Sequence, residues 1–307
     1  MTTVKAKTIG IEIEFTGITR KMAANALHKL FSSEVIYYGG TYDEYRINDS
    51  QGRIWAVKYD GSLKPQRKTR EGYTVIASTD RKCELVSPVL TYEDLELLQS
   101  IADRIEKAGG FVNQTCGIHI HIGAESFSPE KLKDLVNMMT SKEDLIYRAL
   151  EIYENRITYC RKTDERILRD LNNKNPKDKD ELAKVWYNEE DLDKVKNIIK
   201  TKHYHHSRYT HTNLHAFFTK GTIEFRFFNS TLNPILIKSY IQFCLAIINK
   251  VLESNKAIKF KKTVLDNEKY LMRSWLRQLG LNGEEYRDCR YTFLNKLSGD
   301  LVNRVAS

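Results

Sequence analysis

The stretch IGIEIEF, residues 9–15, decides the fold. Apolar side chains at the odd positions alternate strictly with Gly10, Glu12 and Glu14, and a period of two predicts a half-buried β-strand. One face of this strand is fully apolar, while the other presents two carboxylates about 7 Å apart, which is twice the rise per residue. On this stretch alone, a solvated edge of the first strand explains the glutamates equally well. Two later strands with complementary side chains favour a functional site.

The composition indicates a folded protein with a basic surface. With 307 residues the chain can form one large domain or two modest ones, and 41% hydrophobic residues can bury a sizeable core. The formal net charge of +9 points to an acidic partner: nucleic acid, a membrane surface or a phosphorylated small molecule. Lysine and arginine are scattered along the whole length, which argues against nucleic acid.

The cysteines and the apolar runs predict a cytoplasmic protein. The five cysteines are far apart and form no CxxC pair, which fits a reducing compartment and the absence of a zinc knuckle. The N-terminus has no apolar signal core. The most apolar run, residues 235–252, is interrupted by Lys238, Gln242 and Asn249, so we expect a buried helix there and no membrane span.

The pattern along the chain predicts an α+β fold. Strands separated by helical hairpins, without regular βα alternation, favour a mostly antiparallel sheet. We expect a main domain over residues 1–253, with a charged helical insertion at 156–200, and a helical extension over 254–307 packed on it. Residues 37–45 are expected to be a connection and 64–72 a basic loop. Extended segments are expected at 9–15, 53–60, 74–77, 82–86, 117–122 and 222–228, and helices at 19–31, 91–108, 129–139, 141–154 and 234–252.

Two of these strands carry functional groups on their non-apolar faces. Residues 116–122 read CGIHIHI, so His119 and His121 lie side by side, opposite an isoleucine face. A lone histidine is more often structural, but two at this spacing are a common way to present a metal ligand and a neighbour. Residues 222–228 read TIEFRFF, which places Glu224 and Arg226 on one face. This pair is either a surface ion pair of small value or a metal ligand beside a phosphate clamp.

If these strands share one sheet, their polar groups meet on its uncovered face. Asp60 and Glu84 end two further extended segments and would bring the number of acidic groups to five. Five carboxylates in one depression raise each other's pKa values unless cations lie among them. Carboxylates with an imidazole suit Mg²⁺ or Mn²⁺, and two such ions bind phosphate oxygens. Arg226 and a basic loop would complete a triphosphate site.

The ordered set of motifs resembles the amidoligase family. The residues that carry the resemblance are IGIEIEF (9–15), YDGS (59–62) with a later ELVSP (84–88), CGIHIHI (116–122) and NLHAFFTKGTIEFRFFNSTL (213–232). The similarity extends over residues 8–252; each block alone is weakly specific, and their order makes the set specific. The family belongs to the superfamily of glutamine synthetase and glutamate–cysteine ligase. The resemblance therefore implies a curved, mostly antiparallel sheet with helices on its convex face.

The resemblance also implies roles for individual residues. One metal ion would be held by Glu12, His119 and Glu224, and a second by Glu14, Asp60 and Glu84. Arg226 corresponds to an arginine that faces the substrate or the transferred phosphate. The remaining positions are His121 and Ser62 beside the reacting groups, and Asn213, Lys64, Arg156 and Lys162 on the nucleotide side.

The reaction that the resemblance implies is ATP-dependent ligation. ATP phosphorylates a substrate carboxylate to an acyl phosphate, and an amine then displaces phosphate to leave an amide. Two Mg²⁺ or Mn²⁺ ions would screen the negative charges that otherwise repel the incoming carboxylate. The expected partners are a small-molecule or peptide carboxylate and an amine donor, with no membrane and no nucleic acid. The identity of these substrates and the oligomeric state do not follow from the sequence.

Three other functions account for parts of the pattern. A phosphotransferase on the same fold would consume ATP without an amine. A metal-dependent hydrolase would also use an HxH motif, but such motifs usually lie on a parallel barrel, and the alternation that a barrel needs is missing. A non-catalytic nucleic-acid-binding protein would explain the net charge and predicts salt-sensitive binding that survives chelation. The tract with His203, His205 and His206 is expected to be a surface or substrate loop and no metal site.

Overall fold

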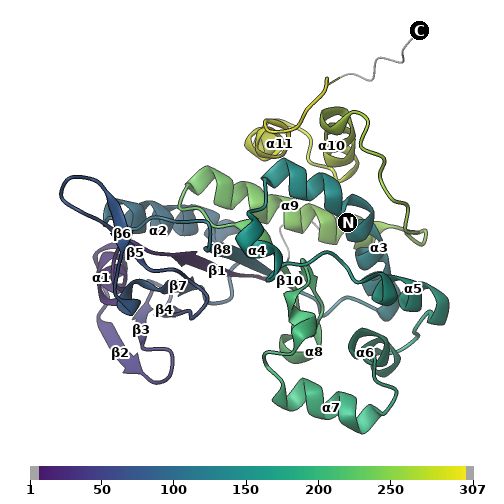
Figure 1. Cartoon of the computed structure of the whole chain (residues 1–307), viewed down its shortest axis with the longest axis horizontal. Helices are drawn as coiled ribbons and strands as arrows, with labels where there is room; N and C mark the ends of the chain where they lie inside the picture. Colours follow the sequence, from purple (N-terminus) through teal and green to yellow (C-terminus); the bar gives the residue numbers. More distant parts are fainter. Residues whose placement is uncertain (1–6, 302–307) are drawn as a thin grey trace.

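The computed structural model describes residues 7–301, and their largest feature is an antiparallel sheet (Figure 1). Its eight strands lie in the order β2-β3-β4-β7-β1-β8-β10-β9. Each pair of neighbours is antiparallel, and β5 and β6 form a separate hairpin. The strands are β1 (Ile9–Phe15), β2 (Val35–Gly39), β3 (Glu44–Asn48), β4 (Ile54–Tyr59), β5 (Gln66–Lys68), β6 (Thr74–Ile76), β7 (Cys83–Val86), β8 (Gly117–Gly123), β9 (Thr212–Asn213) and β10 (Thr222–Asn229).

Eleven α-helices accompany the sheet within residues 7–301. Helices α1, α3, α8 and α9 contact the sheet, and α2 packs against both α1 and α9. Helices α5 to α8 lie beyond the β10 end of the sheet (Figure 1). The helices are α1 (Arg20–Phe31), α2 (Leu95–Lys107), α3 (Pro129–Leu150), α4 (Glu154–Ile157), α5 (Glu165–Lys174), α6 (Lys179–Tyr187), α7 (Leu192–Thr201), α8 (His215–Lys220), α9 (Pro234–Glu253), α10 (Glu268–Gln278) and α11 (Arg287–Leu294).

Strand β1 separates the hydrophobic core from the polar face of the sheet. Its isoleucines are completely buried and belong to one core cluster with residues of α1, α2, α3 and α9. On the other face, Glu12 pairs with His119 of β8, and Glu14 pairs with Glu84 of β7. Directly opposed residues of antiparallel strands point to the same face, so the register alone gathers these polar groups.

Side-chain caps begin the helices at the expected residues. The hydroxyl of Thr19 accepts a hydrogen bond from the backbone N–H of Met22 at the start of α1. Ser128 caps α3 in the same way, and the carboxamide oxygen of Asn233 caps α9. In α3 and α9 the next residue is a proline, whose missing N–H costs nothing at this position. The sequence prediction of these three starts is confirmed.

Three local predictions were wrong. The expected basic loop at residues 64–72 contains strand β5, which pairs with β6. Residues 37–45 are not an irregular connection but the end of β2, a turn and the start of β3. Tyr and Ile favour the strands, and two glycines of positive φ, Gly39 and Gly40, form the turn. No new helix begins at Ser141, since α3 runs unbroken through it. The Ser141 hydroxyl donates to the carbonyl of Asn137 four residues earlier, which a continuous helix allows.

Helix α9 is a core helix of this fold. Among the described residues it is the one helix long and apolar enough to cross a membrane, but 72% of its apolar 18-residue stretch is buried inside the protein. It contacts α2, α3, α11 and β8. The C-terminal helices pack on it through aromatic rings, for example Phe293 of α11 stacked 4.1 Å from Phe243 of α9.

Candidate active site

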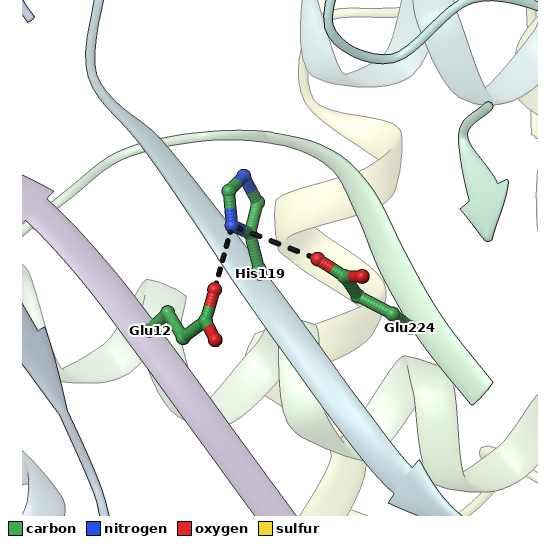
Figure 2. A group of neighbouring side chains, drawn as sticks. All are labelled: Glu12, His119 and Glu224. Carbon is green, nitrogen blue, oxygen red and sulfur yellow. Dashed lines mark hydrogen bonds and ion pairs between the residues drawn. The ribbon is translucent and has the colours of Figure 1, made fainter. Parts of the chain in front are cut away.

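Three strands bring Glu12, His119 and Glu224 together on the polar face of the sheet (Figure 2). The Nδ1 atom of His119 lies 3.0 Å from Oε2 of Glu12 and 3.7 Å from Oε1 of Glu224. One ligand atom from each residue lies within 4.8 Å of the other two, which is close enough for a single cation to contact all three. Two carboxylates and one imidazole form a donor set that suits Mg²⁺ or Mn²⁺.

His121 lies beside this group and supports the same interpretation. Its Nδ1 is 3.0 Å from the hydroxyl of Thr222, whereas its buried Nε2 has no hydrogen-bond partner among residues 7–301. That nitrogen lies 3.5 Å from Glu12 and 3.8 Å from Glu224. A buried polar atom without a partner costs free energy. If Nδ1 donates its proton to Thr222, the Nε2 lone pair faces the carboxylates and fits a bound cation.

A second group combines Glu14, Glu84 and His119. Its members also present ligand atoms within 4.8 Å of one another, and Nε2 of His119 is 3.9 Å from Glu14. Asp60, the third ligand expected here, lines the hollow in front of Glu14 and Glu84 but is not part of the compact group. Its carboxylate instead accepts hydrogen bonds from the backbone N–H, at 2.7 Å, and the hydroxyl of Ser62. Ser62 therefore orients Asp60.

Two buried arginines form charged contacts with the site carboxylates. Arg226 forms an ion pair with Glu224, and its Nε donates to the carbonyl of Tyr159. Arg156 donates from Nη2 to the carbonyl of Arg226 at 2.8 Å, and its Nη1 lies 3.9 Å from Glu14. The guanidinium of Arg156 covers Gly117, where a Cβ atom would lie only 1.3 Å from Nη1. A glycine is needed at this point of β8 because the arginine occupies the space of a side chain.

Burial and neighbouring charges divide the four glutamates into two classes. Burial opposes the ionisation of Glu12 and Glu224, but His119 and His121 hold the pKa of Glu12 well below its usual range. Arg226 and the same histidines hold the pKa of Glu224 at about 2. Burial raises the pKa of Glu14 to about 7, although Arg156 opposes this. Burial and the charge of Glu12 raise the pKa of Glu84 to about 8.

These opposite shifts show where positive charge is lacking. Glu12 and Glu224 are ionised at neutral pH without any added cation. Glu14 and Glu84 are partly protonated at neutral pH. The free-energy cost of burying their negative charge exceeds the stabilisation that nearby cationic side chains provide. Burial also lowers the pKa of His119 to about 4, so its imidazole is neutral and able to coordinate. A divalent cation at the second group would replace the protons on its carboxylates.

The cluster forms the floor of two connected hollows. The first hollow includes Arg156, Tyr159, Tyr209 and Arg226. The second includes Lys58, Lys200, His203, Asn213, His215 and Lys220. Seven residues line both hollows: Glu12, Tyr42, Tyr59, Asp60, Glu84, Tyr204 and Arg208. The shared walls place both hollows next to the same carboxylates, as a reaction between two bound substrates requires.

Arg208 is a site residue that the sequence interpretation missed. Its guanidinium lies 5.0 Å from the ring of Tyr204 and 5.7 Å from that of Tyr209, and it donates to the carbonyl of His203 at 3.3 Å. Arg226 and Arg156 each face a glutamate, whereas Arg208 has no acidic partner at ion-pair distance among the described residues. Its loop follows the histidine tract, and only the charge and the Arg-Tyr sequence could have drawn attention to it.

The other predicted positions divide between the site and the surface. Asn213 donates from its carboxamide to Glu224 at 2.6 Å and lines the second hollow. Lys162 is not at the hollows, because its ammonium pairs with Asp144 on α3. The side chain of Lys64 does not line them either, although its backbone N–H bonds to Thr115 at the rim. A nucleotide contact by these two lysines is not supported by this arrangement.

The histidine tract at residues 203–206 is part of the wall. His203 and Tyr204 line the second hollow, and the hydroxyl of Tyr204 hydrogen-bonds to that of Tyr42 across the mouth. The rings of His205 and His206 contact each other in a tilted arrangement, with centroids 4.2 Å apart and an interplanar angle of 39°. Within residues 7–301, neither metal-capable group includes a residue of this tract. The placement agrees with a substrate loop.

Comparison with known proteins identifies the family of this chain. The family model described as "Putative amidoligase enzyme" matches residues 5–248, which include every strand of the sheet and both ligand groups. The chain belongs to the amidoligase family. Its members are enzymes of the ligase type, so the resemblance seen in the ordered motifs is confirmed. No curated protein matches this amidoligase chain significantly.

Proposed function

We propose that this amidoligase is an ATP- and Mg²⁺-dependent carboxylate–amine ligase that forms an amide through an acyl phosphate. The observation that carries the proposal is the meeting of Glu12, His119 and Glu224 beside a second carboxylate group. These side chains come from three strands that are far apart in the sequence. A surface ion pair would not require such convergence. We further propose that the sheet is the curved platform of a glutamine synthetase-like core, with its helices on the convex face.

The two groups would hold one divalent cation each. Glu12, His119 and Glu224 supply the first set of donors, while Glu14 and Glu84 supply two carboxylates of the second. When bound, the cations would neutralise the phosphate charges of ATP and of the developing acyl phosphate. Asp60 would join the second set after a small movement from its bonds with Ser62.

The arginines of the hollows would bind the reacting anions. Arg226 is held in one orientation by its ion pair with Glu224 and its bond to Tyr159, so it offers its charge to an oxyanion at no further cost of ordering. Arg208 contacts two tyrosine rings and has no acidic partner among the described residues, so its guanidinium would bind the second anionic group. Together these residues would bring the carboxylate oxygen and the terminal phosphorus atom into line.

The proposed chemistry needs no nucleophile from the protein. The carboxylate oxygen attacks the terminal phosphorus, ADP departs, and the amine nitrogen then attacks the acyl carbon as phosphate departs. All five cysteines are buried and unpaired, and burial raises the pKa of the Cys83 thiol far above its usual value, so thiol chemistry at the site is not part of the proposal. Free thiols also support the cytoplasmic location that we propose.

A hydroxylamine trap tests this function without knowledge of the natural amine. Hydroxylamine converts an acyl phosphate to a hydroxamate, which we expect to form from carboxylates only with both ATP and Mg²⁺. Glu12→Gln should abolish the product, whereas Glu106→Gln, on the exposed face of α2, should leave it unchanged. Hydroxamate that still forms with chelator present, or at the parent rate in Glu12→Gln, would refute the proposal.

A further inference from the structure

The two carboxylates of the second group lie in one row across the sheet, between two cationic side chains. Lys58 of β4 is directly opposed to Glu84 of β7, and Glu84 is opposed to Glu14 of β1. Residues opposed in this way project from the same face of the sheet. On the β8 side of Glu14, the guanidinium of Arg156 covers Gly117. A lysine and an arginine therefore flank the two glutamates.

The two cations of this row are held very differently. The Arg156 side chain is buried, and its guanidinium is anchored by a hydrogen bond to the carbonyl of Arg226. The Lys58 side chain is 26% exposed, and its ammonium lies 3.0 Å from Oε2 of Glu84. An ammonium on a flexible four-carbon chain moves more easily than a planar guanidinium that is fixed by hydrogen bonds. Lys58 is therefore the cation of the row that can leave its glutamate.

Lys58 and a divalent cation compete for the carboxylate of Glu84. Glu84 belongs to the second metal-capable group, so a cation held there must touch its carboxylate oxygens. The Lys58 ammonium, 3.0 Å from one of these oxygens, would lie within about 5 Å of that cation. Like charges at such a distance repel strongly in a buried site. The ammonium at Glu84 therefore opposes the second cation, and its departure favours it.

The second hollow offers the ammonium another partner when an anion binds there. The cationic side chains that line this hollow are Lys58, Lys200, Arg208 and Lys220. Neither Lys200 nor Arg208 has an acidic partner at ion-pair distance within residues 7–301. Four cations around one space suit the phosphates of a nucleotide. Lys58 can thus exchange a carboxylate for a phosphate while it remains in the same hollow.

We propose that Lys58 is a displaceable cation that couples nucleotide binding to the second metal site. Its ammonium opposes a divalent cation at Glu84 until the phosphates of the nucleotide draw it into the second hollow. The nucleotide and the second cation therefore favour each other's binding. This inference rests on the proposed ligase function and adds the residue that couples two of its binding steps.

Mn²⁺ binding, followed by the electron paramagnetic resonance of the free ion, tests this coupling without turnover. The ion at the second group is the one that Glu84→Gln loses. In Lys58→Met without nucleotide, its dissociation constant should fall by at least about tenfold, because the competing charge is removed. Lys58→Arg, which keeps the charge, should bind Mn²⁺ like the parent.

Nucleotide binding supplies the second readout. The probe is adenosine 5′-(β,γ-imido)triphosphate, which is not hydrolysed, and its affinity is measured by calorimetry at saturating Mg²⁺. The dissociation constant should rise by about tenfold in Lys58→Met, because one contact between ammonium and phosphate is lost. An unchanged nucleotide affinity in this variant would overturn the inference.

The matched control is Lys200→Met, which removes the same charge from the same hollow but no ion pair with Glu84. It should leave the dissociation constant of the second Mn²⁺ at the parent value. An equal fall in both variants would reveal a general charge effect, and an unchanged or higher constant in Lys58→Met would show that Lys58 does not compete. Either result overturns the inference and leaves the ligase function standing. A parent that binds neither Mn²⁺ nor nucleotide would contradict the proposed function, and this inference with it.

Discussion

Replacement of Gly117 by alanine tests the geometry of the site wall. The new Cβ atom would lie 1.3 Å from Nη1 and 2.1 Å from Cζ of Arg156, so the guanidinium must leave its position. It would lose the 2.8 Å hydrogen bond to the carbonyl of Arg226 and its contact with Glu14. Breaking a buried charged contact costs about 3–5 kcal/mol, and the adjoining hollow lets the guanidinium recover part of its solvation. We expect a destabilisation of about 3 kcal/mol.

Urea denaturation of the metal-free protein measures this loss as a shift of the midpoint at constant slope. In the double variant Gly117→Ala with Arg156→Met, the steric conflict is relieved. Its loss of unfolding free energy should therefore be smaller than the sum of the losses in the two single variants. Gly61→Ala is the control, because a Cβ atom there meets only ordinary contacts at 3.6 Å from Tyr59. A loss below about 0.5 kcal/mol in Gly117→Ala would show that Arg156 does not cover the strand.

Three further predictions concern charge. Glu12→Gln should lower hydroxamate formation by at least about a hundredfold, as the loss of a metal ligand does, and near-normal turnover would remove that role. Arg208→Lys and Arg226→Lys should each raise the KM for Mg·ATP or lower kcat by about tenfold, because the compact ammonium of lysine does not replace the planar guanidinium, which binds two oxygens at once. Unchanged kinetics in both variants would contradict this. Burial raises the pKa of Glu14 to about 7 and that of Glu84 to about 8, so the folded state keeps protons that the unfolded chain has lost. The free energy of unfolding of the metal-free protein should therefore fall from about pH 6.5 to about pH 8, above the range of the histidines, and Mg²⁺ should lessen the fall; a flat profile in denaturant melts would refute the shifts.

Strict alternation explains why the centre of the site could be predicted. In a period-two strand the face of every side chain follows from its position, so the sequence alone places Glu12, His119 and Glu224 on non-apolar faces. Their meeting additionally required β1, β8 and β10 to be neighbours in one sheet, which the sequence left as a condition and which the structure shows.

Residues outside the strands were not predictable in the same way. Asp60, Lys64 and Lys162 lie in turns and loops, where neither periodicity nor register determines the direction of a side chain. Arg208 reaches the hollows only because its loop returns over the sheet between α7 and β9. The paired strands β2 and β3 were missed because a short Gly- and Tyr-rich segment carries both strand and turn signals.

The most direct test of the central claim is a titration of the purified protein with Mn²⁺, followed by the electron paramagnetic resonance of the free ion. The account predicts two bound ions per chain, with at least one lost in Glu224→Gln and both retained in Glu106→Gln. A parent protein that binds no Mn²⁺, or a Glu224→Gln variant that binds as much as the parent, would contradict it.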